Sequence, residues 1–84
     1  MKHAGGEALA SITELLQQIR LRDGVKEKKM GIFYRKSKSF PHFHEDPRGL
    51  FADLAVGSDF CRYPVNTREH WNTLLSAVDR ALRA

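Results

Sequence analysis

The chain has 84 residues, enough for one folded domain but not two, because a separate hydrophobic core needs roughly 50 residues or more. Hydrophobic residues make up 42% of the sequence and charged residues 29%, which excludes a disordered or low-complexity chain. No apolar run approaches the roughly 18 residues of a membrane span. We therefore expect a single soluble, cytoplasmic domain over residues 1–84, without a membrane partner, as a monomer or homodimer.

The first predicted element is a helix over Gly6–Arg22. Its apolar residues follow the i, i+3, i+4, i+7 spacing of a helix with one buried face, and they are Ala8, Leu9, Ile12, Leu15, Leu16 and Ile19. Gly24 is the glycine expected just past a helix end, and basic residues in the last turn complement the helix dipole.

Residues 25–64 have the pattern of β-strands, with nearly all the aromatic residues and all three prolines. The predicted strands are Val25–Arg35, Ser39–His44, Leu50–Val56 and Phe60–Tyr63. Their short connections imply antiparallel neighbours. Gly31 indicates a bend or a break of the first strand into two pieces, because glycine has no side chain to pack there. Pro41 cannot donate to a sheet ladder, so we do not expect a regular central strand around it.

The last predicted element is a helix from Asn66 to the C-terminus, with Asn66 and Glu69 as a variant capping box. Its apolar face carries Trp71, Leu74, Leu75, Val78 and Leu82. The order helix, four strands, helix predicts an α+β fold. We expect a two-layer sandwich in which both helices pack on one face of an antiparallel four-stranded meander.

The densest polar cluster lies between Phe40 and Asp53. Strand residues two apart share a face, so His42 and His44 project together. Burial of Phe43 in the core then requires His42 to lie opposite Asp53, since a one-residue slip would put both histidines among the leucines. We therefore predict a polar sheet face that carries His42, His44 and Asp53, with a contact between His42 and Asp53.

Several interpretations fit this cluster. Imidazoles and a carboxylate at His42, His44 and Asp53 suit zinc, copper, nickel or iron, but the longer signatures of known metal sites are missing. A hydrolase built with a nearby serine or cysteine lacks a nucleophile elbow, so we expect no catalytic residues. The structural alternative is that the histidines only satisfy local hydrogen bonds and fix the register.

Among the functional interpretations we favour a binding module that uses the polar face for a small anionic ligand or a partner, without a cofactor. The candidate binding residues are His42, His44, Asp53, Tyr34, Arg35, Lys36 and Arg62.

The formal net charge of +4 is concentrated in residues 20–38, which hold eight basic and two acidic side chains. Basic residues interleaved with aromatic ones are typical of single-strand or RNA binders, which gives a second possible partner. The candidate nucleic-acid residues are Lys26, Lys28, Lys29, Arg35, Lys36 and Lys38. Lysine-rich edge strands also protect sheets from edge-to-edge aggregation, and this reading stays open.

Cys61 is the only cysteine, which excludes an internal disulfide and a cysteine-rich zinc site. On a short strand, a single cysteine of this kind is expected to be a small buried hydrophobic residue.

The segment from Gly31 to Val65 reads FYRKS, then F-x-HFHED, then GLFADL. It resembles small bacterial proteins grouped as a luciferase-like domain of unknown function. The resemblance implies that the recurring residues of the motif are Tyr34, Arg35, Lys36, His42, His44, Glu45, Asp46, Gly49 and Asp53. The resemblance gives these residues no roles, and it implies no light emission, because an adenylate-forming loop and a flavin-binding pattern are both missing.

Overall fold

The computed structural model describes residues 2–35, 38–56 and 58–83. In chain order the elements are β1 (Lys2–His3), α1 (Gly6–Ala10), α2 (Thr13–Arg20), β2 (Lys26–Lys29), β3 (Ile32–Arg35), β4 (Lys38–Asp46), β5 (Gly49–Val56), β6 (Asp59–Pro64) and α3 (Arg68–Arg83). The strands of the described part form one antiparallel sheet of order β2-β3-β4-β5-β6, and the short β1 pairs with β4. The fold is α+β, as predicted, with a five-stranded rather than a four-stranded meander.

The additional strand arises at Gly31, where the predicted strand Val25–Arg35 reverses direction. β2 and β3 form an antiparallel hairpin on either side of this glycine. Gly31 has φ 79°, in the left-handed region that glycine adopts without strain. A Cβ at this position would lie 2.6 Å from Leu9 Cδ2, so any side chain here would force Leu9 to shift. The predicted break at Gly31 is therefore confirmed, and it is a complete turn.

The predicted single helix over Gly6–Arg22 is wrong in one respect, because it is interrupted between α1 and α2. Ile12 leaves the helical conformation, with φ −120° and ψ 28°. On either side of it, the Ser11 hydroxyl donates to Ala8 O at 2.6 Å and the Thr13 hydroxyl donates to Ala10 O at 2.8 Å. Such local side-chain bonds compete with helix continuation. The apolar face continues across the interruption, since Ile12 itself is buried.

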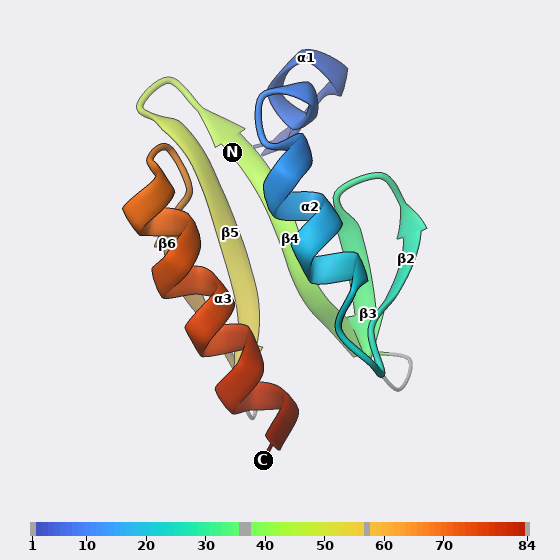
Figure 1. The fold of residues 1–84 in the computed structure, drawn as a ribbon. Helices are drawn as coiled ribbons and strands as arrows, with labels where there is room; N and C mark the ends of the chain where they lie inside the picture. The colour runs from blue at the N-terminus through green and yellow to red at the C-terminus, as the bar shows by residue number, and fades with distance from the viewer. Residues whose placement is uncertain (1, 36–37, 57, 84) are drawn as a thin grey trace.

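Helices α2 and α3 lie side by side on one face of the sheet (Figure 1). The apolar stripes of the helices meet the apolar side of the strands. The buried core consists of Leu9, Ile12, Leu15, Leu16, Ile19, Phe33, Phe40, Phe43, Ala52, Leu54, Val65, Leu74, Ala77 and Val78. In the described part of the chain, no helix covers the opposite face of the sheet, which we call the open face (Figure 1).

The N-terminus of α3 is capped by Thr67 rather than by the predicted Asn66. The Thr67 hydroxyl accepts a hydrogen bond from His70 N at 3.1 Å, and His70 Nδ1 accepts one from Asn66 N at 3.1 Å. The Asn66 side-chain amide instead bonds to β5, where its Oδ1 accepts from Leu50 N at 2.8 Å and its Nδ2 donates to Leu50 O at 3.1 Å. The hydrogen bonds of Asn66 therefore attach the start of α3 to β5.

Among the described residues, no helix has the length and apolar character needed to cross a membrane.

Candidate functional site

The pairing of β4 with β5 decides which side chains reach the open face. His42 lies opposite Asp53, Phe43 opposite Ala52, and His44 opposite Phe51. Phe43 and Ala52 are 1% and 0% exposed in the core, so their neighbours along each strand project from the other side of the sheet. This is the register that the hydrophobic pattern predicts.

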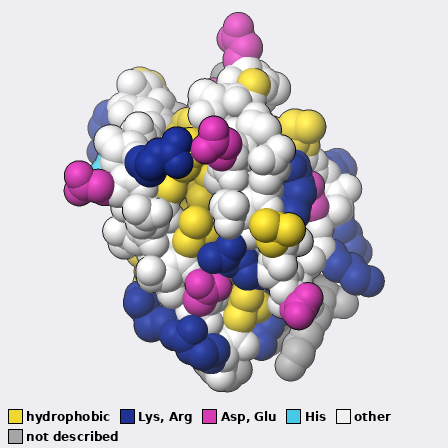
Figure 2. Space-filling model, in the orientation of Figure 1, with side chains coloured by type: hydrophobic (Ala, Val, Ile, Leu, Met, Phe, Trp, Pro, Cys, Tyr) yellow, Lys and Arg dark blue, Asp and Glu magenta, His cyan; other side chains and the backbone are white. Residues whose placement is uncertain are grey.

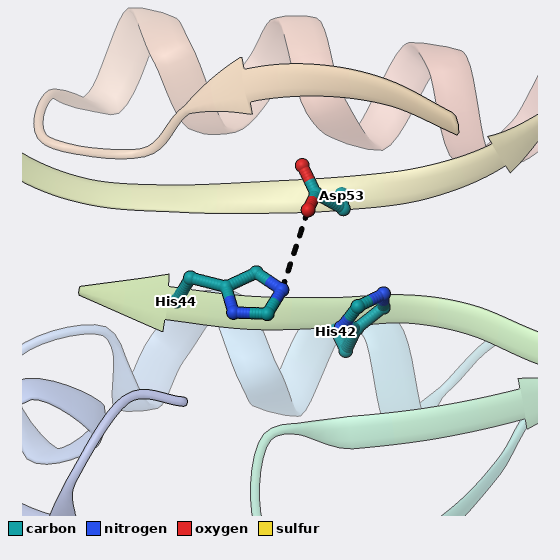
Figure 3. A group of neighbouring side chains, drawn as sticks. All are labelled: His42, His44 and Asp53. Atoms are coloured by element: carbon teal, nitrogen blue, oxygen red, sulfur yellow. Dashed lines mark ion pairs between the residues drawn. The ribbon is translucent and has the colours of Figure 1, made fainter. Parts of the chain in front are cut away.

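His42, His44 and Asp53 come together on the open face (Figure 3). Their metal-ligating atoms, one from each residue, all lie within 4.8 Å of one another. The imidazole rings of His42 and His44 are 4.6 Å apart between centroids and meet edge to face at 72°. The side chains of His44 and Asp53 are only 12% and 13% exposed. The cluster is therefore compact and largely shielded from bulk water.

His44 contacts the Asp53 carboxylate from a diagonal position, a contact that the sequence pattern did not predict. His44 Nε2 lies 3.3 Å from Asp53 Oδ2. His44 stands diagonal to Asp53 in the ladder, and diagonal neighbours are within reach of long side chains. His42 stands directly opposite, with its donor nitrogen inside the same 4.8 Å group. Both imidazoles thus converge on one carboxylate.

Arg62 holds the Asp53 carboxylate from the neighbouring strand β6. Its Nε donates to Oδ1 at 2.8 Å and its Nη2 donates to Oδ2 at 3.0 Å, a two-pronged contact between directly paired residues. These hydrogen bonds lower the pKa of Asp53. Burial opposes this effect, while the charge of Arg62 and the imidazoles of His44 and His42 add smaller lowering contributions. Asp53 is therefore an oriented anion at neutral pH.

Phe60 completes one side of the site and is a residue that the sequence analysis missed. Its ring lies 5.5 Å from the His42 ring at 84°, and Phe60 is 54% exposed. A shallow hollow of about 550 Å³ is lined by His42, Asp53, Phe60 and Arg62. Strand alternation could have found Phe60, because it lies two residues before Arg62 and therefore on the same face.

An irregularity at Pro41 directs the side chains of β4. Phe40 and Phe43 are both buried although they are three residues apart, which a regular strand does not allow. The pairing of β3 with β4 shifts between Tyr34, opposite Ser39, and Ile32, opposite His42. Between these two pairs β4 has one more residue than β3. The extra residue lies next to Pro41, which has no backbone N–H to donate to a neighbouring strand. The expectation that the strand is irregular around Pro41 is confirmed.

The structure does not bring all the predicted binding residues together. The Arg35 guanidinium donates to the carbonyls of Ala81 at 2.9 Å and Leu82 at 3.3 Å, at the end of α3 on the helix-covered side. Tyr34 is half-buried on β3, with the Lys28 ammonium 5.4 Å from its ring centre. Lys36 lies outside the described residues. Of the other candidates in the described part of the chain, only Arg62 lines the same hollow as His42 and Asp53.

The basic segment 20–38 is partly neutralised within the fold. Arg20 Nη2 donates to Glu27 Oε2 at 3.0 Å. Arg22 Nε donates to Asp79 Oδ1 at 3.0 Å. Figure 2 shows the helix-covered face, on which basic and acidic side chains are interspersed. Of the candidate nucleic-acid residues, Lys26, Lys28 and Lys29 belong to the edge strand β2, whereas Lys36 and the side chain of Lys38 lie outside the described part of the chain.

Cys61 is exposed, so the prediction that it is buried is wrong. It lies opposite the buried Leu54 in the ladder, but β6 is the edge strand and nearly all of its residues are exposed. Alternation along a strand predicts the face of the sheet on which a residue lies. A residue on an edge strand can still be accessible to solvent on that face.

No protein-family model matches this chain, and neither a curated protein nor a solved structure does. The resemblance to a luciferase-like domain stays a prediction. The functional argument therefore rests on the geometry of the open face.

Proposed function

We propose that this chain is a metal-binding domain that holds one divalent transition-metal ion through His42, His44 and Asp53. The observation that carries the proposal is the convergence of three metal-ligating atoms, from three different residues, within 4.8 Å. Two imidazoles and one carboxylate are ligands that zinc and iron accept in proteins.

The distances support ligation with only small side-chain movements. Ligand atoms lie about 2.0–2.2 Å from zinc, which places neighbouring ligand atoms roughly 3.4 Å apart in a tetrahedral site. His44 Nε2 and Asp53 Oδ2 are already 3.3 Å apart. The ligand atoms of the three residues lie within 4.8 Å of one another, so they are at most about 1.4 Å beyond that spacing.

Arg62 is compatible with a bound ion and would orient one of its ligands. A carboxylate offers about four lone-pair positions on its two oxygens, so Asp53 can accept from Arg62 and still bind a metal ion. Partners of this kind fix the orientation of a ligand in protein metal sites. Three protein ligands also leave at least one coordination position open, as in zinc sites that bind a further molecule.

Isothermal titration calorimetry with Zn²⁺ tests the proposal on the full chain. We expect one ion per chain in the wild type. His42→Ala, His44→Ala and Asp53→Asn should each weaken binding at least about 10-fold, since even the outer partners of metal ligands contribute about 10- to 100-fold.

His70→Ala is the matched control, because His70 lies in α3 and bonds to the backbone of Asn66. Circular dichroism establishes that each variant is folded. Absence of zinc binding, or equal zinc affinity in all four variants, would leave the histidines with the purely structural role of fixing the register.

A further inference from the structure

The hollow beside the proposed metal site is lined by the positively charged Arg62 and by Phe60, which is exposed. We propose that the metal-loaded site binds a small carboxylic acid with an apolar substituent. In this complex one carboxylate oxygen coordinates the ion, the carboxylate also accepts from Arg62, and the apolar substituent lies against Phe60. This inference rests on the proposed metal site and specifies its ligand.

The charges on this part of the open face favour an anion once the metal is present. A divalent ion, the Asp53 carboxylate and the Arg62 guanidinium carry +2, −1 and +1, so the ion-loaded group has a formal excess of positive charge with neutral imidazoles. A concentrated positive charge attracts and orients an anionic ligand. In zinc sites with three protein ligands the open coordination position takes a water or a substrate molecule, and carboxylate oxygens are ligands that zinc accepts.

Arg62 has hydrogen-bonding capacity beyond its contact with Asp53. A guanidinium has five N–H donors, and Asp53 accepts only from Nε and Nη2. The Arg62 side chain is 51% exposed, so a ligand in the hollow can reach it. Because Asp53 already holds the guanidinium in place, little side-chain entropy is lost when an anion binds.

Phe60 determines which class of anion fits. Phe60 is 54% exposed and lines the hollow together with His42, Asp53 and Arg62. Burial of an apolar group against this ring is favourable, whereas inorganic phosphate gains nothing from it. The hollow of about 550 Å³ is shallow and has few lining residues, which favours a small molecule over a large cofactor.

The test is a titration of benzoate, acetate and inorganic phosphate into the full chain, with and without saturating Zn²⁺, followed by amide NMR shifts. We expect benzoate to bind the zinc-loaded protein most tightly and to shift the amides of β6 around Phe60 and Arg62. Phe60→Ala should reduce the benzoate affinity to that of acetate. Arg62→Gln should weaken benzoate about 10-fold, with Arg62→Lys intermediate.

Arg48→Gln is the matched control, since Arg48 pairs with Asp46 and does not line the hollow. Native mass spectrometry establishes beforehand that each variant carries zinc. Failure of zinc to bind the wild type would overturn the proposed function itself. With zinc bound, the carboxylate inference is overturned by any of three results: no benzoate binding, tighter binding of phosphate than of benzoate, or benzoate affinity that is independent of zinc or of Arg62.

Discussion

His42 faces Asp53 directly across the β4–β5 ladder, and His44 reaches the same carboxylate from a diagonal position, with its Nε2 3.3 Å from Asp53 Oδ2. One imidazole therefore approaches Asp53 from the opposite position and the other from the diagonal. Both approaches depend on a single strand register, which the buried pair Phe43 and Ala52 fixes from the other face. The core of this small domain thus positions the groups on its open face.

The turn at Gly31 should be sensitive to any side chain. Gly31→Ala introduces strain at φ 79° and places a Cβ 2.6 Å from Leu9 Cδ2, so we expect a loss of about 2–3 kcal/mol in the free energy of unfolding. Gly24→Ala is the control, because Gly24 has φ 89° and nothing within 4 Å of its added Cβ, and should lose only about 1 kcal/mol. Equal losses in urea denaturation would show that Leu9 does not constrain the turn.

The Glu27 carboxylate should make stability depend on acid pH. Its hydrogen bonds with Arg20 and with Gly31 N lower the pKa of Glu27 below 4.5. A carboxyl whose pKa is lower in the folded than in the unfolded state stabilises fully above the unfolded pKa, and this stabilisation is lost as the pH falls through the folded pKa. Glu27→Gln should therefore cost about 1 kcal/mol at neutral pH and almost nothing in strong acid.

Urea denaturation of the wild type and Glu27→Gln at pH 7 and pH 2 measures this difference. Glu7→Gln is the control, because Glu7 is exposed at the start of α1 and should change the stability little at either pH. A difference between wild type and Glu27→Gln that stays constant across this range would contradict the assignment of the effect to the Glu27 charge.

Arg35 should act as a structural residue. It donates to the carbonyls of Ala81 and Leu82 in the last turn of α3, where a cation is favourable to the helix. Arg35→Met should lower the free energy of unfolding by about 1–2 kcal/mol and speed amide exchange at the end of α3. Lys29→Met on the exposed edge strand is the comparison, and it should stay within about 0.5 kcal/mol of the wild type. Equal free energies of unfolding and equal amide exchange in Arg35→Met and Lys29→Met would show that Arg35 does not stabilise the end of α3.

Cys61 should react readily in the folded protein. It is exposed on the edge strand β6. We expect a disulfide reagent such as Ellman's reagent to modify it at nearly the rate of the unfolded chain, and Cys61→Ser to change stability by no more than about 0.5 kcal/mol. Reaction that requires prior unfolding would contradict the exposed position.

The sequence was most informative where burial on one face determines the register. The alternation around Phe43 and Leu54 specifies which residues lie inside, because a slip of one residue would bury the histidines and expose the aromatic ring. The same alternation correctly puts His42 and Asp53 on the other side. The diagonal contact of His44 with Asp53 depends on side-chain rotation, and no periodic pattern carries that information.

The sequence was less informative about interruptions and edges. Gly31 is compatible with a bulge, a bend or a full turn, and only the pairing of β2 with β3 distinguishes them. The apolar spacing continues through Ile12, so it gives no sign that the helix stops there. The exposure of Phe60 and Cys61 follows from the edge position of β6, which depends on the strand order and therefore on the complete sheet.

The most direct test of the account is an imidazole ¹⁵N NMR spectrum of the full chain before and after addition of one equivalent of Zn²⁺. We predict that the ring-nitrogen signals of His42 and His44 shift by the amount typical of metal ligation, while those of His70 stay unchanged. Signals of His42 and His44 that do not respond to zinc would contradict the account.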